Sequence, residues 1–173
     1  MSLSTYDVCV PTFRQVLGGL SANLDKAAAH CEAGGVDPAT WLNARLADDM
    51  QPFTFQVMQA VNHSAGTVAK LRGEAFERPS GLDSFAACKA AVDGAIAALD
   101  AVTPADLDGT ETKDVTFQTP RGDMNFTGQG YLMSFAFPNF FFHATTAYDL
   151  LRHLGLPIGK RDFMGAVQLK TAT

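Results

Sequence analysis

The stretch FAFPNFFFHATTAYDLLRHLG, residues 135–155, decides the fold that this sequence predicts. Its apolar residues recur every three or four positions along two neighbouring rows, which is typical of an α-helix that buries more than one face. Gly155 and Pro157 follow as a stop signal. We therefore expect one long helix over residues 130–154, kinked at Pro138, that lies at the centre of a helical bundle or is shared with a second copy of the chain.

Three more long helices are predicted upstream of this one. Apolar residues spaced by four and three run over residues 6–31, 50–71 and 85–102, the pattern of helices that pack nearly parallel to one another. Ser4 and Ser84 are placed to cap the first and the third of them. The chain is therefore expected to supply four helices long enough to form a bundle.

The second long helix carries polar residues whose faces matter for any site. A short helix that begins at Asp37 and Pro38 is expected to precede it. The periodicity of the long helix places Gln56 and His63 on a polar line that faces outward. Asn62, in contrast, interrupts an apolar row. We therefore expect Asn62, and not His63, to point toward the core.

One strand signal precedes the last helix. Val115 and Phe117, then Met124 and Phe126, alternate with polar residues around a Pro/Gly turn, as in a β-hairpin with one covered face. No linker or internal repeat interrupts the chain, so a single domain over residues 1–173 is expected. The predicted fold class is all-α: a four-helix bundle with a short extra helix and a small β-hairpin before the last helix.

Composition limits the partners and the compartment. A formal net charge of -5 and a pI near 5.2 argue against nucleic acid and against an anionic membrane surface, because phosphate binding needs clustered Lys and Arg. The apolar run over residues 131–142 is about half the length of a bilayer span. The N-terminus has no basic region followed by an apolar stretch. The cysteines are odd in number and widely spaced, which favours a reducing compartment: Cys9, Cys31 and Cys88. We therefore expect a cytoplasmic protein.

Asn139 and His143 are the polar exceptions in the aromatic stretch. They are four residues apart, so in a helix they lie on one face within reach of each other. One interpretation is a structural pair that satisfies itself by hydrogen bonds, together with Asn62. The other is that these residues point into a pocket between the second and fourth helices, where bundles build ligand and metal sites. The residues alone leave both interpretations open.

The residues make a poor intrinsic case for a metal or for a familiar catalytic motif. The chain has four histidines, and no two of them are three or four residues apart. A catalytic zinc site needs about three good ligands, and an amide oxygen is a weak one. The sequence contains no G-x-S-x-G elbow and no complete dinucleotide-binding glycine loop. No substrate or reaction follows from these residues.

Several segments together carry a resemblance that covers essentially the whole chain. They are VPTFRQVLGGLSANLDKA, FTGQGYLMSFAFPNFFFH, IGKRDFMG and the closing HATTAYDLLRHLG. With four long helices and a short helix after the first, the chain resembles the DinB/YfiT-like superfamily of bacterial four-helix-bundle proteins. Within it, the segments look like an uncharacterised branch known as a domain of unknown function.

The resemblance implies a pocket and a ligand set. In better-known members of the superfamily three histidines hold a divalent metal, one from the second helix and two from an H-x-x-x-H on the fourth, and some members are metal-dependent thiol transferases. His143 matches the second histidine of that motif, and Asn139 stands where the first is expected. Met58 or Asn62 lies where the ligand from the second helix is expected. The implied cofactor is therefore a divalent metal, Zn or Ni, with His143 as its one strong ligand.

Two hypotheses of different classes follow. The first is a small-molecule pocket centred on His143 and Asn139, with Asn62 and Met58 beside them, in which His143 is a metal ligand or a general base. The alternative is a non-catalytic homodimeric bundle without metal, in which the aromatic last helix is buried against a second copy of the chain. Whether the protein is an enzyme is left open by the residues.

Overall fold

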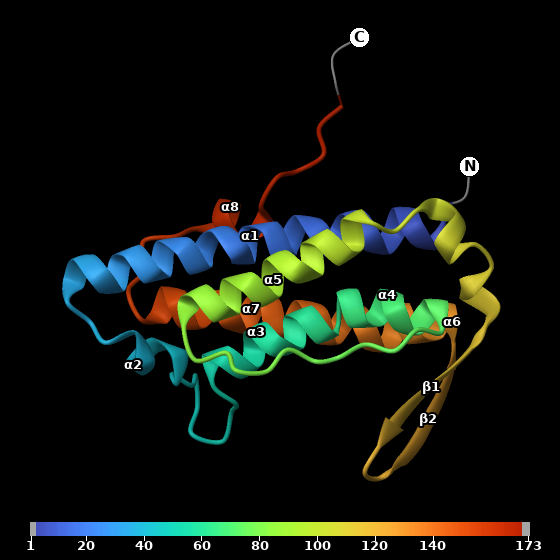
Figure 1. Cartoon of the computed structure of the whole chain (residues 1–173), viewed down its shortest axis with the longest axis horizontal. Helices are drawn as coiled ribbons and strands as arrows, with labels where there is room; N and C mark the ends of the chain where they lie inside the picture. Colours follow the sequence, from blue (N-terminus) through green and yellow to red (C-terminus); the bar gives the residue numbers. More distant parts are fainter. Residues whose placement is uncertain (1–2, 171–173) are drawn as a thin grey trace.

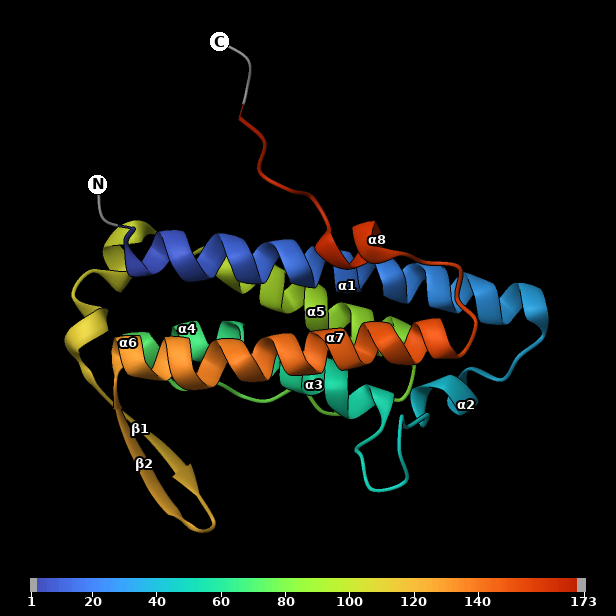
Figure 2. The same ribbon diagram turned by 180° about the vertical axis from the view of Figure 1, so that it is seen from behind.

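The computed structural model describes residues 3–170, which are mostly helical with one two-stranded β-hairpin (Figure 1). The longest helix, α1 (Thr5–Gly34), packs mainly against α5 (Phe85–Asp100), and α3 (Phe53–Asn62) packs mainly against α7 (Phe137–His153). Figure 2 shows α7 on the face of the molecule turned away from the viewer of Figure 1. The remaining elements are short: α2 (Pro38–Leu42), α4 (Ala65–Arg72), η1 (Pro104–Leu107), η2 (Thr110–Thr112), β1 (Asp114–Thr119), β2 (Gly122–Thr127), α6 (Gly128–Gly130), η3 (Tyr131–Ala136) and α8 (Lys160–Met164).

Local signals set the ends of α1 and α5 as expected. The Ser4 hydroxyl accepts from the backbone N–H of Asp7, whose carboxylate accepts in return from the Ser4 backbone N–H, so a capping box begins α1. Gly35 ends that helix in the left-handed region, at φ 62°, where a side chain would be strained. The Ser84 hydroxyl caps α5 by accepting from the N–H of Ala87. Local capping residues therefore determine these helix boundaries.

The second long helix is interrupted, which corrects the expectation of one helix over residues 50–71. It begins at Phe53 and breaks between α3 and α4, at His63 and Ser64. The Ser64 hydroxyl donates to the carbonyl oxygens of Ala60 at 2.7 Å and Val61 at 3.1 Å. The Ser64 side chain therefore takes the acceptor that its own backbone N–H would use in a continuous helix, a known competition between hydroxyl and backbone. His63, the C-cap residue of α3, is buried.

The last long helix starts with an expanded turn rather than a simple kink. α6, η3 and α7 form one continuous helical column, and η3 is a π-helical stretch just before Pro138. The backbone N–H of Phe137 donates to the carbonyl oxygen of Leu132, five residues back. Because proline has no N–H and its ring needs space in the preceding turn, a wider turn is the physical response of the helix. The prediction of one helix that contains the aromatic stretch is confirmed.

The predicted β-hairpin is present before the last helix. β1 and β2 pair antiparallel, with Val115 opposite Phe126 and Phe117 opposite Met124. Val115 is buried and the two phenylalanines are half-buried against the start of the last helix, whereas Met124 is exposed. The hairpin thus covers one end of the helical column with its aromatic face, and its tip extends into solvent (Figures 1 and 2).

The buried apolar side chains form one core cluster that runs along all the long helices. Phe13 of α1 contacts Phe137 and Phe140 of α7 at ring-centroid distances of 5.2 and 4.8 Å, which ties these two helices together. Within residues 3–170, no helix has both the length and the apolar character that a membrane crossing requires.

Candidate functional site

Two histidine rings meet in the interior between α3 and α7. His63 comes from the break after α3 and His143 from the middle of α7. Their ring centroids are 5.8 Å apart and their planes differ by 8°, so the rings are stacked. Their exposed fractions are 4% and 9%. The expectation that His63 faces outward is therefore wrong, because His63 and the buried Gln56, seven residues apart, share the side of α3 that packs on α7.

Aromatic rings surround the imidazole pair. Phe135 contacts the His63 ring at a centroid distance of 5.7 Å, and Phe55 and Phe142 contact the His143 ring at 6.0 and 5.2 Å. All three contacts are edge-to-face. The pair therefore lies in a largely apolar shell, where a hydrogen bond or a ligand bond is stronger than in water.

Gln56 fixes the tautomer of His143. Its side chain was expected to face outward, and the structure corrects this, because Gln56 is only 2% exposed and contacts His143. The amide nitrogen of Gln56 donates to the backbone oxygen of Gln51 at 2.9 Å, so its Oε1 is the atom that lies 2.8 Å from His143 Nδ1. An amide oxygen can only accept, and Nδ1 must carry the proton. The lone pair of His143 is thereby left on Nε2, available to a ligand.

His63 has no comparable partner. Its Nδ1 atom is buried and makes no hydrogen bond to any of the described residues. A buried polar nitrogen without a partner costs about 1 to 3 kcal/mol, and such atoms are rare in folded proteins. The structure thus contains one imidazole that is oriented by a hydrogen bond and one that still offers an unused nitrogen.

Both imidazoles are neutral near pH 7. Burial lowers the pKa of His143 to about 4. Burial also lowers the pKa of His63 to about 4, and the nearby charges of His143 and Arg78 add to that effect. A charged imidazole is disfavoured in this apolar shell because it would lose its hydration. The neutral form is the one that binds a metal or accepts a proton.

Asn139 lies beside the pair. The structural-pair interpretation requires a hydrogen bond between Asn139 and His143, and the structure does not have one. Its side-chain nitrogen donates to the backbone oxygen of Phe135 at 2.7 Å, within its own helix. Phe135, Asn139 and His143 are successive residues of one helix row. Because the His63 ring contacts the first and the third, the half-buried Asn139 lies along the same side of α7 as His63.

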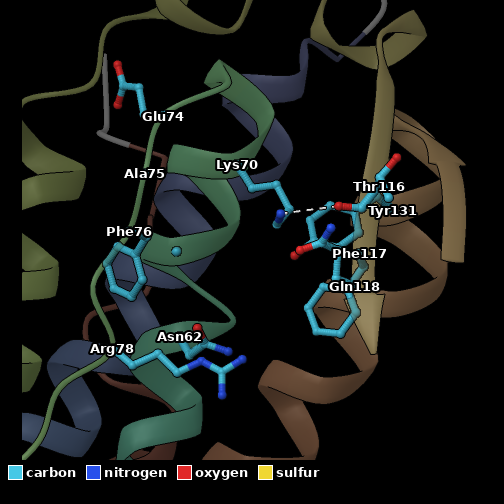
Figure 3. Close-up of a pocket in the computed structure, with 11 residues that line it drawn as sticks. Asn62, Lys70, Glu74, Ala75, Phe76, Arg78, Thr116, Phe117, Gln118 and Tyr131 are labelled. Atoms are coloured by element: carbon cyan, nitrogen blue, oxygen red, sulfur yellow. Dashed lines mark hydrogen bonds between the residues drawn. The ribbon is translucent and has the colours of Figure 1, made fainter. Parts of the chain in front are cut away.

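The other two predicted pocket residues make no side-chain hydrogen bond to either imidazole. Asn62 is half-buried, and its side-chain nitrogen donates to the Oε1 atom of Gln59 at 3.1 Å. It lines a separate cavity between α4 and the hairpin (Figure 3). Met58 is half-buried on α3. The residues that sequence reasoning missed are His63 and Gln56, and the hydroxyl of Ser64 is the local signal that could have revealed the break.

The donor set of the pair matches part of a metal site. No group of three or more His, Cys, Asp or Glu side chains converges anywhere in residues 3–170 in a way that could hold an ion. The pair supplies two neutral imidazoles, and Asn139 supplies an amide oxygen nearby. Imidazole suits zinc and nickel, whereas an amide oxygen is a weak third ligand for them.

Comparisons with known proteins agree on the family and the fold. The family described as Domain of unknown function (DUF1993) matches residues 5–164. The chain is also similar to a solved structure, a DinB family member protein from Shewanella denitrificans, with 33% sequence identity and a TM-score of 0.86 over 96% of this chain and 95% of that one. No curated protein matches.

Proposed function

The chain belongs to the DUF1993 family, an uncharacterised branch of the DinB-like superfamily, and on this premise we propose that it binds a small ligand at a centre formed by His63 and His143. The observation that carries the proposal is the stacking of two buried, neutral imidazoles from different helices, one oriented by Gln56 and the other with an unused nitrogen. A purely structural core would have little reason to keep an unsatisfied histidine there.

The finer form of this proposal is a degenerate divalent-metal centre. His63 and His143 would hold the ion, Zn or Ni, and Asn139 would stand in the place of the third imidazole. A divalent ion bound there would polarise an oxygen or sulfur atom of a ligand. The protein would contribute two things to such a centre. Gln56 holds the His143 ring in one tautomer, and aromatic rings surround the pair.

Metal analysis and a dye-competition titration with zinc and nickel test this proposal. Wild type is expected to bind about one equivalent, and His63→Ala and His143→Ala are each expected to lose it. His153→Ala is the matched control, because His153 is exposed at the end of α7 and is expected to leave binding unchanged. Equal, near-zero metal in wild type and in all three variants would remove the metal form of the proposal.

A second candidate function is a non-catalytic homodimer that uses the outer face of α7 and η3. Three large apolar side chains are exposed there: Met133 at 53%, Phe141 at 39% and Phe142 at 55%. Exposed aromatic side chains that gather on one helix are common in protein interfaces. Light scattering at micromolar concentration tests this candidate. It is supported if wild type is a dimer, if the double variant Met133→Glu/Phe142→Glu is a monomer, and if the control Leu169→Glu remains a dimer. A monomeric wild type contradicts it.

We also propose that α1, the α3–α4 pair, α5 and α7 form a DinB-type four-helix bundle and that the protein acts in the cytoplasm. The main pairings of α1 with α5 and of α3 with α7 support the first point. The cytoplasmic location is supported by the three cysteines, which are buried and free, as suits a reducing compartment: Cys9, Cys31 and Cys88. Burial raises the pKa of Cys9 to about 12, so its thiol is inert as a nucleophile.

A further inference from the structure

A cavity of about 470 Å³ lies between α4, the segment that follows it and β1 (Figure 3). Its volume is in the range of small-molecule pockets. Two of its lining residues are cations, Lys70 of α4 and Arg78 of the following segment. In a chain with a net charge of -5, a cavity that gathers two cations is a local reversal of the overall charge.

Among residues 3–170, neither cation is paired with a carboxylate. Lys70 Nζ donates to the backbone oxygen of Thr116 at 3.3 Å, and a carbonyl oxygen carries no net charge. Arg78 makes no hydrogen bond or ion pair with any side chain of residues 3–170. The one acidic residue of the lining, Glu74, pairs with Arg72 at 2.8 Å. The charged side chains of the lining therefore sum to a net positive charge.

Aromatic rings form the walls between these charges. Phe76 packs so closely on α4 that a Cβ atom at Gly66 would come within 2.8 Å of its ring, so this wall depends on the glycine. Phe117 and Tyr131 form the opposite wall, with ring centroids 6.4 Å apart. Tyr131 is buried, and burial raises the pKa of its hydroxyl, which therefore stays protonated. The cavity thus offers flat apolar surfaces flanked by cationic groups.

We propose that this cavity binds a small organic anion with a planar aromatic body, such as an aromatic carboxylate. The guanidinium of Arg78 can hold a carboxylate with two parallel hydrogen bonds, and Lys70 adds a second positive charge. The ring of the ligand would lie against Phe76 or Phe117, as aromatic groups prefer in such walls. Figure 3 shows Arg78 extended beside Asn62, whose amide can bond a polar substituent of the ligand.

This site is distinct from the imidazole pair and goes beyond the function proposed above. Phe135 lies between the two: its ring contacts Phe117 of the cavity wall at 4.6 Å and the His63 ring at 5.7 Å. Arg78 is also close enough to His63 to lower the pKa of that imidazole, so the two sites adjoin where Arg78 lies. The two sites can be tested separately, one with metal and one with an organic acid.

Isothermal titration of the full chain with phenylacetate, and with its neutral analogue phenylacetamide, tests the proposal. Phenylacetate is expected to bind saturably and at least about tenfold more tightly than the amide, because only the acid carries the charge. Arg78→Gln and Lys70→Gln are each expected to weaken phenylacetate binding at least about fivefold. Arg121→Gln, an exposed cation at the hairpin turn, is the matched control and is expected to bind as wild type.

Three results of the titrations would overturn the proposal. They are the absence of saturable phenylacetate binding up to about 20 mM, equal affinity for the amide, and unchanged affinity in Arg78→Gln. Arg78 is exposed on an irregular segment, so its substitution leaves folding intact and that result is decisive. Backbone amide shifts at Thr116 to Gln118 locate the bound acid. If the acid shifts only the imidazole signals of His63 and His143, it binds at the other centre and the cavity proposal fails.

Discussion

Two polar clusters bridge helices in this protein, and they are built in opposite ways. Between α1 and α5, Lys89 donates to the Ser21 hydroxyl and to Asp93, both at 2.8 Å, and it lies 3.5 Å from Asp25. Between α3 and α7, two neutral imidazoles meet, and one of their buried nitrogens has no hydrogen-bond partner among the residues that the structure describes. The first cluster is charged, partly exposed and fully bonded, whereas the second is neutral, buried and incomplete.

This difference is the reason we propose the second cluster, and not the first, as the binding centre. The hydrogen bond to Asp93 raises the pKa of Lys89, so the ion pair is present at every physiological pH. Burial lowers the pKa of both histidines, so the second cluster remains uncharged and its ring nitrogens stay available. A fold keeps an unsatisfied buried group only where something other than stability selects it. The predictions below test this contrast.

The largest expected effect is an acid-dependent loss of stability from the imidazole pair. Each ring has a pKa of about 4 in the folded protein and an ordinary value of 6.5 in the unfolded chain. As the pH falls below 6.5 the unfolded chain takes up protons first, so stability is intact above pH 6.5 and is lost between pH 6.5 and 4. The loss at pH 4 is about 3 kcal/mol for each ring.

Urea denaturation at pH 7 and at pH 4, on metal-free protein, measures this loss. The double variant His63→Leu/His143→Leu is expected to lose much less stability over the same interval. His30→Leu/His153→Leu is the matched control and is expected to behave as wild type, because both rings are at least partly exposed. If wild type and the first double variant have the same dependence on pH, the buried pair is not the acid-sensitive element.

The second prediction completes the cluster. Asn139→His adds an imidazole four residues before His143, on the row that faces His63. Three imidazoles form a strong zinc site, so zinc affinity is expected to rise at least about 100-fold, which corresponds to about 2.7 kcal/mol. The dye-competition titration measures it. Asn62→His is the control, because Asn62 lines the other cavity; equal tightening in both variants would contradict the geometry.

The third prediction removes the bond that orients His143. Gln56→Leu leaves the buried Nδ1–H of His143 without an acceptor and is expected to cost about 2 kcal/mol in the free energy of unfolding. Gln59→Leu is the matched control, because Gln59 is half-buried and bonds only the side chain of Asn62, and it should cost less than about 1 kcal/mol. Similar costs for both substitutions would mean that Gln56 does not hold the ring.

Much of the fold could be predicted from local sequence because local chemistry determines it. The capping residues Ser4 and Ser84, the glycine at 35 and the alternation in the hairpin each act within a few residues of the boundary that they define. The aromatic stretch around His143 is helical as expected, since its apolar spacing leaves no other way to bury it.

The candidate site was harder to predict because it depends on how two helices pack. Gln56 and His63, seven residues apart, share one side of α3, and their polar character suggests solvent although that side packs on α7. The contact between Gln56 and His143 joins residues 87 positions apart, and it depends on how α3 packs on α7. The spacing of residues within one helix does not determine which rows of side chains on two helices pack against each other.

The smallest expected effect concerns the charged cluster. Lys89→Met removes its cation, but the side chains involved are about one third to one half exposed, and the Ser21 hydroxyl still donates to Asp93. The expected cost in urea denaturation is smaller than that of Gln56→Leu, and it should shrink further in about 1 M salt, which screens exposed charges. Lys113→Met, an exposed lysine outside any ion pair between described residues, is the control. Because the Gln56→Leu cost comes from a buried neutral bond, it should not change with salt; if salt lowered both costs equally, the proposed distinction between the two clusters would fail.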